Sequence, residues 1–164
     1  MSDSVATAIT QTATAATAFT TVAATFCGVL ENRNAAAPVN AVSHIAFGDK
    51  AARQDAVSMQ YTGVGAALNS AAMVSWAGFH HLVFRPHQRR ASFADAFVRG
   101  AVTAAIAYVV DYHVVPKRLT PGFEKRLSNR SLFVIYAALA AGLALGDQLS
   151  QRAAAARQIS GPAV

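Results

Sequence analysis

An aspartate inside an apolar stretch is the first residue of this sequence that could do chemistry. Asp111 lies in the otherwise apolar run Ala101–Val115. An ionisable side chain in such a run is a candidate functional group by default, because a charge is costly to place in hydrocarbon. His113 is two residues away, and His44 and Asn40 belong to a segment expected at the same membrane face. These four residues predict a proton-handling or ligand-binding pocket.

Simpler structural roles for the carboxylates also fit the sequence. Asp111 can be an interfacial carboxylate that pairs with Lys117 or Arg118 and holds the first loop onto the bundle, since long basic side chains at span ends reach the interface. Asp95 and Arg99 are four residues apart with the acid first, which predicts a structural ion pair on one helix face.

The other histidines do not predict a metal or haem site. His80 and His81 are adjacent, so on a helix they point about 100° apart and do not easily face one metal. We interpret them as an interfacial pair beside Trp76 and Phe79. The sequence has no HExxH, CxxC or CxxCH motif, and the single cysteine, Cys27, has no histidine in its own helix. We therefore expect no metal, no cofactor and no catalytic residue.

Charges are scarce and unevenly spaced along the chain. Of its 164 residues, 54% are hydrophobic and 13% are charged, against about 25% charged residues in a soluble domain. This composition excludes a disordered chain and disfavours a soluble helix bundle. Uncharged runs of 27, 29 and 16 residues follow Asp3, Asp55 and Arg130. The 20 residues from Ala91 to Val110 are interrupted by Asp95 and Arg99. Because about 20 apolar residues cross a bilayer, we predict four spans at about 6–30, 58–84, 92–115 and 131–150.

The predicted fold class is all-α, a polytopic membrane protein whose four transmembrane helices form a compact bundle in one domain, 1–164. The third span begins with an S-x-x-D capping box of Ser92 and Asp95. The first span holds eight threonines, whose hydroxyls can bond a backbone carbonyl one turn back. A small-xxx-small series in the second span favours close helix packing or an oligomer interface; its members are Gly63, Ala67, Ala71 and Ser75.

The first loop and the overall charge place the chain relative to the bilayer. Val39–Phe47 predicts one short amphipathic interfacial helix, ended by Gly48 and lying on the membrane or against the bundle.

Four spans put both termini on one side and the first and third loops on the other. Those two loops carry eight Lys and Arg against six on the terminal side, which favours cytoplasmic loops. The basic residues are interleaved with the predicted spans. We therefore expect the net charge of +6 to interact with the lipid bilayer and not with a nucleic acid.

Two stretches carry a resemblance to a known group. They are residues 38–44 (PVNAVSH) with Gly48 and Asp49, and residues 111–124 (DYHVVPKRLTPGFE). Together with the spans they make the chain resemble small four-span inner-membrane proteins of proteobacteria that have no assigned activity. The resemblance implies the bacterial inner (cytoplasmic) membrane as the location, and it adds no catalytic residue.

Three functions remain open from the sequence. Small-residue helix faces and the lack of a catalytic motif favour a non-enzymatic accessory, assembly or scaffold subunit, with other membrane proteins or further copies of the chain as partners. The first alternative is a small transporter or proton-coupled membrane protein that uses His44, Asp111 and His113. The second is a membrane enzyme that acts on a lipid head group with the same residues.

Overall fold

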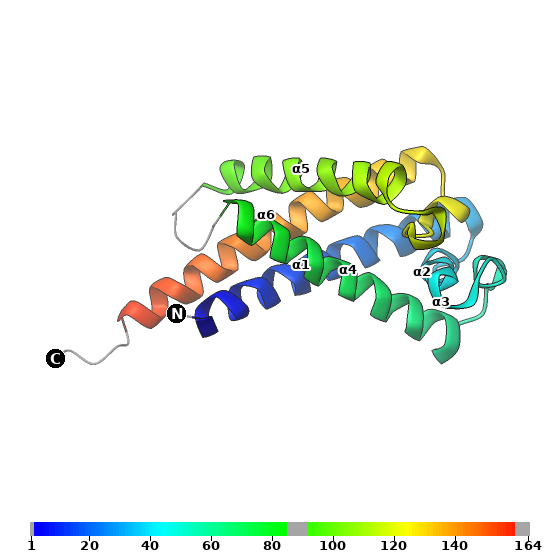
Figure 1. Cartoon of the computed structure of the whole chain (residues 1–164), viewed down its shortest axis with the longest axis horizontal. Helices are drawn as coiled ribbons and strands as arrows, with labels where there is room; N and C mark the ends of the chain where they lie inside the picture. The colour runs from blue at the N-terminus through cyan, green and yellow to red at the C-terminus, as the bar shows by residue number, and fades with distance from the viewer. Residues whose placement is uncertain (1, 85–91, 160–164) are drawn as a thin grey trace.

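Four long helices form an elongated bundle. The computed structural model describes residues 2–84 and 92–159, and every regular element in those ranges is helical. The long helices are α1 (Ser2–Asn32), α4 (Val64–Phe84), α5 (Phe93–Val109) and α6 (Asn129–Ile159). In Figure 1, α1 and α6 run side by side, α5 lies along α6, and α4 crosses α1 obliquely. The all-helical prediction is confirmed.

Three segments are long and apolar enough to cross a membrane: Val5–Asn32, Phe93–Val114 and Asn129–Ala156. They correspond to the first, third and fourth predicted spans and support a membrane protein. The second predicted span, 58–84, is occupied by a π-helical turn (Met59–Gly63) and α4. Polar side chains such as Asn69, His80 and His81 keep α4 from qualifying as a candidate span by hydropathy, so its crossing stays a prediction.

The contact between α1 and α6 is unusually close because two glycines of α6 face α1. A Cβ on Gly142 would lie 2.7 Å from the Cα of Ala16, and a Cβ on Gly146 would collide with the Cα of Thr12. The two glycines are four residues apart, which is the GxxxG spacing of tightly packed membrane helices. The fourth predicted span carries this spacing in the sequence, but the close packing of Gly142 and Gly146 was not predicted.

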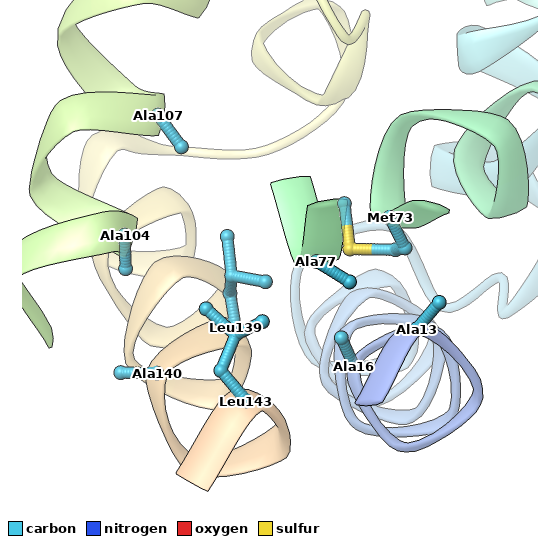
Figure 2. Packing of buried hydrophobic residues seen from close by; sticks show 9 residues of the cluster. All are labelled: Ala13, Ala16, Met73, Ala77, Ala104, Ala107, Leu139, Ala140 and Leu143. Carbon is cyan, nitrogen blue, oxygen red and sulfur yellow. The ribbon is translucent and has the colours of Figure 1, made fainter. Parts of the chain in front are cut away.

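Alanines and a few large side chains fill the space between the four helices. Figure 2 shows Leu139 of α6 reaching between Ala104 of α5 and Ala77 of α4. Leu139 and Leu143 are the largest fully buried apolar side chains of this core. Small partners let these leucines interdigitate, which is how dispersion contacts accumulate when lipid tails compete for the same surface. The cluster comprises Ala13, Ala16, Met73, Ala77, Ala104, Ala107, Leu139, Ala140 and Leu143.

The buried face of α4 differs from the predicted one. Its buried residues are Gly65, Asn69, Met73, Ala77, His80 and His81. In the predicted series, Ala67, Ala71 and Ser75 are instead exposed. The buried face includes the larger residues Asn69 and Met73, so a series of small residues does not by itself identify the face that packs within the bundle.

The hydroxyls of α1 bond as the sequence predicts. Thr10 donates to the carbonyl of Ala6 at 2.9 Å, and Thr14 donates to that of Thr10 at 2.8 Å. Thr25 donates to the carbonyl of Thr21 at 2.9 Å. Each of these donors is satisfied within its own helix.

The first loop folds back onto the bundle. The predicted single helix is two helices, α2 (Ala36–Val42) and α3 (His44–Phe47), which meet at Ser43. Gly48 ends the segment as predicted, with a φ of 75° that favours glycine. All of α2 from Ala37 to Val42 is buried, and α2 contacts α1 and α4. Its place at the membrane surface remains a prediction.

Charged residues join the first loop to the third, which holds the 3₁₀ turns Lys117–Leu119 and Phe123–Lys125. Lys125 donates to the Asp49 carboxylate at 2.8 Å, and Arg126 pairs with Asp55. The hydrogen bond from Lys125 lowers the pKa of Asp49 from its ordinary value. The pair therefore persists at neutral pH and is lost as acidification protonates the carboxyl group.

We expect Gly146→Ala to destabilise the protein by about 1–3 kcal/mol, because the new methyl group forces α1 and α6 apart. Gly78→Ala is the matched control, since a Cβ there has no neighbour within 4 Å. Unfolding in SDS, followed by the fluorescence of Trp76, measures both. Equal stability of the two variants would contradict the close contact.

Candidate functional site

A fully buried histidine joins three helices at one end of the bundle. His80 lies in the last turns of α4 and has no exposed surface. Its Nδ1 is 2.8 Å from the Thr103 hydroxyl of α5, and its Nε2 is 3.0 Å from the Asp147 Oδ2 of α6. Both ring nitrogens are thus within hydrogen-bond distance of a side chain from another helix.

The neighbouring histidine turns toward the same carboxylate. His81 is 3% exposed, and its Nε2 lies 2.9 Å from the Thr12 hydroxyl of α1. The same nitrogen is 3.9 Å from the Oδ1 of Asp147. One buried carboxylate therefore sits between two imidazole rings. We call His80, His81, Asp147, Thr12 and Thr103 the His–Asp cluster.

The α1–α6 contact explains why these residues meet. Gly146 packs on Thr12, so the next residue of α6, Asp147, lies at the level of Thr12. The end of α4 brings its two histidines to that level. Their divergence of about 100° lets the two rings approach one carboxylate from different sides.

This arrangement corrects our interpretation of His80 and His81 as an interfacial pair. They are interior residues, while Trp76 and Phe79 contact each other with ring centroids 5.8 Å apart. Divergent side chains disfavour a shared metal, but they do not prevent two rings from sharing a carboxylate. Within residues 2–84 and 92–159, the structure has no group of three His, Cys, Asp or Glu suited to a metal ion.

The partners of His80 suit both protonation states of its ring. In either state the Nε2–H donates to the Asp147 carboxylate. A neutral ring accepts a hydrogen bond at Nδ1 from the Thr103 hydroxyl, and a protonated ring donates to the same oxygen. Because a hydroxyl both donates and accepts, the ring can gain or lose a proton in place.

Asp147 is the charge centre of the cluster. Its Oδ2 bonds His80, whereas its Oδ1 is buried and, among the described residues, has no partner at hydrogen-bond distance. The Nε2 of His81 lies 3.9 Å from this Oδ1. An ionised carboxylate at full burial needs such partners, because desolvation of an uncompensated charge costs several kcal/mol.

The predicted loop-side pocket is divided among separate contacts. Asp111 lies in a π-helical turn (Val110–Val114) and accepts a 2.6 Å hydrogen bond from the Tyr136 hydroxyl. His113 is exposed, and its ring contacts Tyr108 at 5.8 Å between centroids. No hydrogen bond within the described part of the chain joins Asp111 to His113.

The two first-loop members of that pocket hold the loop itself. His44 is buried, and its Nδ1 lies 2.9 Å from the Ala41 carbonyl. The amide of Asn40 donates to the carbonyls of Gln54 at 2.9 Å and Ala56 at 3.1 Å, and its oxygen accepts from Thr62 at 2.6 Å. These bonds give Asn40 a structural role in closing the loop.

The predicted ion pair of Asp95 and Arg99 takes another form. Asp95 and Ser92 form the expected capping box at the start of α5. The Nε of Arg99 donates at 3.3 Å to the backbone carbonyl of Asp95. The two residues therefore touch through the main chain, because the cap engages the carboxylate.

The His–Asp cluster was missed because its parts lie on four helices. The sequence places His80, His81 and Asp147 at the same end of the bundle, which is the one signal that could have suggested it. It does not say which helices adjoin or how each is rotated. No family model matches the chain, and neither a curated protein nor a solved structure shows significant similarity to it. Its function must therefore be inferred from this geometry.

We expect Thr103→Val to cost about 1–3 kcal/mol in the free energy of unfolding, because it leaves the Nδ1 of His80 buried without a partner. Thr103→Ser should restore most of the loss. Thr14→Val is the control, since that hydroxyl is exposed and bonds within its own helix. SDS unfolding of the three variants tests the bond, and equal losses for the two valine variants would refute it.

Proposed function

We propose that the chain is a proton-handling integral membrane protein, of the class of small proton-coupled transporters, in which His80 and Asp147 hold the exchangeable proton. The observation that carries the proposal is the imidazole–carboxylate pair with no exposed surface on either side chain. This replaces the loop-side group of His44, Asp111 and His113 as the proton-handling centre.

Charge accounting explains how a proton would act here. With a neutral His80 ring and an ionised Asp147, the pair carries one negative charge. Proton uptake by the ring makes the pair neutral overall and adds a direct attraction between α4 and α6. Since the bilayer interior penalises net charge, protonation changes the stability of this helix contact. That change is the means by which a proton gradient can act on the bundle.

The surroundings of the pair contain few other groups that titrate. His81 is the second imidazole of the cluster, and α1 and α5 contribute the neutral hydroxyls of Thr12 and Thr103. The Phe84 ring lies 5.2 Å from that of His80, between centroids. Two imidazoles and one carboxylate thus set the charge of the described part of this site.

The proposal keeps four spans, with α4 as the second, and the bacterial inner membrane as the location. The buried histidine face of α4 supports its inclusion in the bundle despite its lower hydropathy. The location depends on the sequence resemblance.

Proton movement in liposomes tests the function. Purified protein is reconstituted with an internal pH-sensitive dye, and a pH gradient is imposed. We expect the wild type to dissipate the gradient faster than empty liposomes, and Asp147→Asn to slow this at least tenfold, because the amide cannot exchange the proton. His113→Ala is the matched control outside the cluster. A wild type equal to empty liposomes, or an unaffected Asp147→Asn protein, would refute the proposal.

An accessory or scaffold subunit is the second candidate, and the outward face of α4 favours it. A groove of about 660 Å³ runs between α1 and α4. Small side chains would allow the backbone of another membrane helix to approach it closely. Its lining includes Thr10, Thr14, Thr17, Thr21, Ala66 and Ser70.

Size measurement in lipid nanodiscs tests this second function. We expect a complex larger than the monomer, and Ser70→Phe should disrupt it by filling the groove. Val83→Phe, on the exposed end of the same helix, is the control. A wild-type protein that stays a monomer when purified from native membranes, with no co-purifying partner, would exclude the scaffold role.

A further inference from the structure

A second polar site, independent of the His–Asp cluster, adjoins Asp111. A cavity of about 80 Å³ lies among α1, α4, α6, the π-helical turn that holds Asp111, and the first-loop and third-loop residues packed on them. Most of its lining is apolar, with Met73 and Leu139 among the lining residues. Four polar side chains also face it: Thr20, Asn69, Asp111 and Tyr136.

The charge of this lining is one-sided. Among the described residues that line the cavity, Asp111 is the only acidic one, and none is Lys, Arg or His. Among the described residues, the ion pairs engage Asp49, Asp55 and Asp147, and Asp111 has none. A carboxylate at membrane depth usually has a cationic partner. Asp111 can therefore accept a cation that is not part of the chain.

One of the two basic residues expected to pair with Asp111 is engaged elsewhere. Arg118 donates from Nε to the Ile45 carbonyl at 3.1 Å, which ties the third loop to the first. The Asp111 carboxylate instead uses Oδ2 to accept the Tyr136 hydroxyl. That bond orients the carboxylate, and it does not involve the other carboxylate oxygen, Oδ1.

The backbone at Asp111 is also irregular. The amide of Val115 donates to the carbonyl of Val110 at 3.0 Å, an i→i+5 bond that marks the π-helical turn. Such turns are rare and recur at functional sites, because the extra residue redirects side chains. Here the turn carries the one acidic residue of the cavity.

Aromatic rings adjoin the carboxylate. Tyr136 lines the cavity, and its ring centroid is 5.3 Å from that of Tyr108 and 6.1 Å from that of Tyr112. Ring faces attract cations, most strongly organic ammonium groups that shed water easily. Across the cavity, Asn69 donates weakly to Thr20 and Thr21 at 3.4 Å, and its amide oxygen is a second acceptor.

We propose that this cavity binds a small ammonium group, held by the Asp111 carboxylate, the Tyr136 ring and the Asn69 amide oxygen. The volume limits the ligand: an apolar cavity of about 150 Å³ holds benzene, so this one holds a nitrogen with few carbons. A free alkylamine and the ethanolamine head group of a lipid share this chemistry.

Calorimetry on the full chain in phosphatidylglycerol nanodiscs tests the proposal, with methylammonium chloride as the probe and sodium chloride as the ionic-strength reference. We expect saturable binding that Asp111→Asn weakens at least tenfold. Asp95→Asn is the matched control, because it removes the same charge from the same helix at its capped end. Absence of saturable binding in the wild type, or equal binding by both variants, would overturn the site.

A measurement on the wild type keeps the test decisive if Asp111→Asn does not fold. A hydrophobic carbodiimide labels membrane carboxyl groups, and mass spectrometry locates the label. We expect methylammonium to protect Asp111 and not Asp95, and labelling of Asp111 that methylammonium leaves unchanged would overturn the proposal. Adding phosphatidylethanolamine to the nanodiscs separates the two sources: a lower methylammonium affinity identifies the lipid head group, and an unchanged affinity identifies the free amine.

Discussion

The close approach of α1 and α6 is the contact on which the rest of the bundle depends. In lipid no hydrophobic effect drives helices together, so their association needs backbones that come near enough for dispersion forces. Gly142 and Gly146 provide this approach along one stretch of α6. At the other end of the pair, Glu31 of α1 accepts hydrogen bonds from Ser128 and Ser131 at the start of α6. The antiparallel pair is thereby fixed at both ends, and the remaining helices pack on it.

Buried polar side chains form different kinds of hydrogen bond at the two ends of the bundle. Near Asp147, side chains from four helices converge, and each hydrogen bond links two helices. Near Asn40, an amide binds backbone carbonyls of its own loop. The first arrangement makes helix packing depend on the protonation of the His–Asp cluster. The second consists of amide and carbonyl groups, so it holds the loop whatever the protonation of nearby side chains. The chemistry we propose accordingly lies at Asp147 and Asp111, and not at Asn40.

Much of the fold could be predicted from the sequence, because charge spacing and capping are local signals. Two of the uncharged runs located apolar helices, α1 and α6. Ser92 and Asp95 marked the start of α5, and Gly48 ended the first-loop segment. Helix rotation could not be predicted. In lipid both the buried and the exposed faces are apolar, so periodicity does not separate them. The series of Ala71 was compatible with packing in the bundle or in an oligomer, and Ala71 is exposed on the monomer. The approach of His80 to Asp147 depends on that rotation.

The bonding of the α1 threonines bears on how the chain is assembled. The principal partner of α1 is α6, which is synthesised last, so a nascent α1 enters the bilayer long before that partner exists. Its hydroxyls at Thr10, Thr14 and Thr25 bond carbonyls of the same helix and need no neighbour. These three donors are therefore satisfied in the membrane before the other helices arrive. Final assembly then depends on the arrival of Gly142 and Gly146.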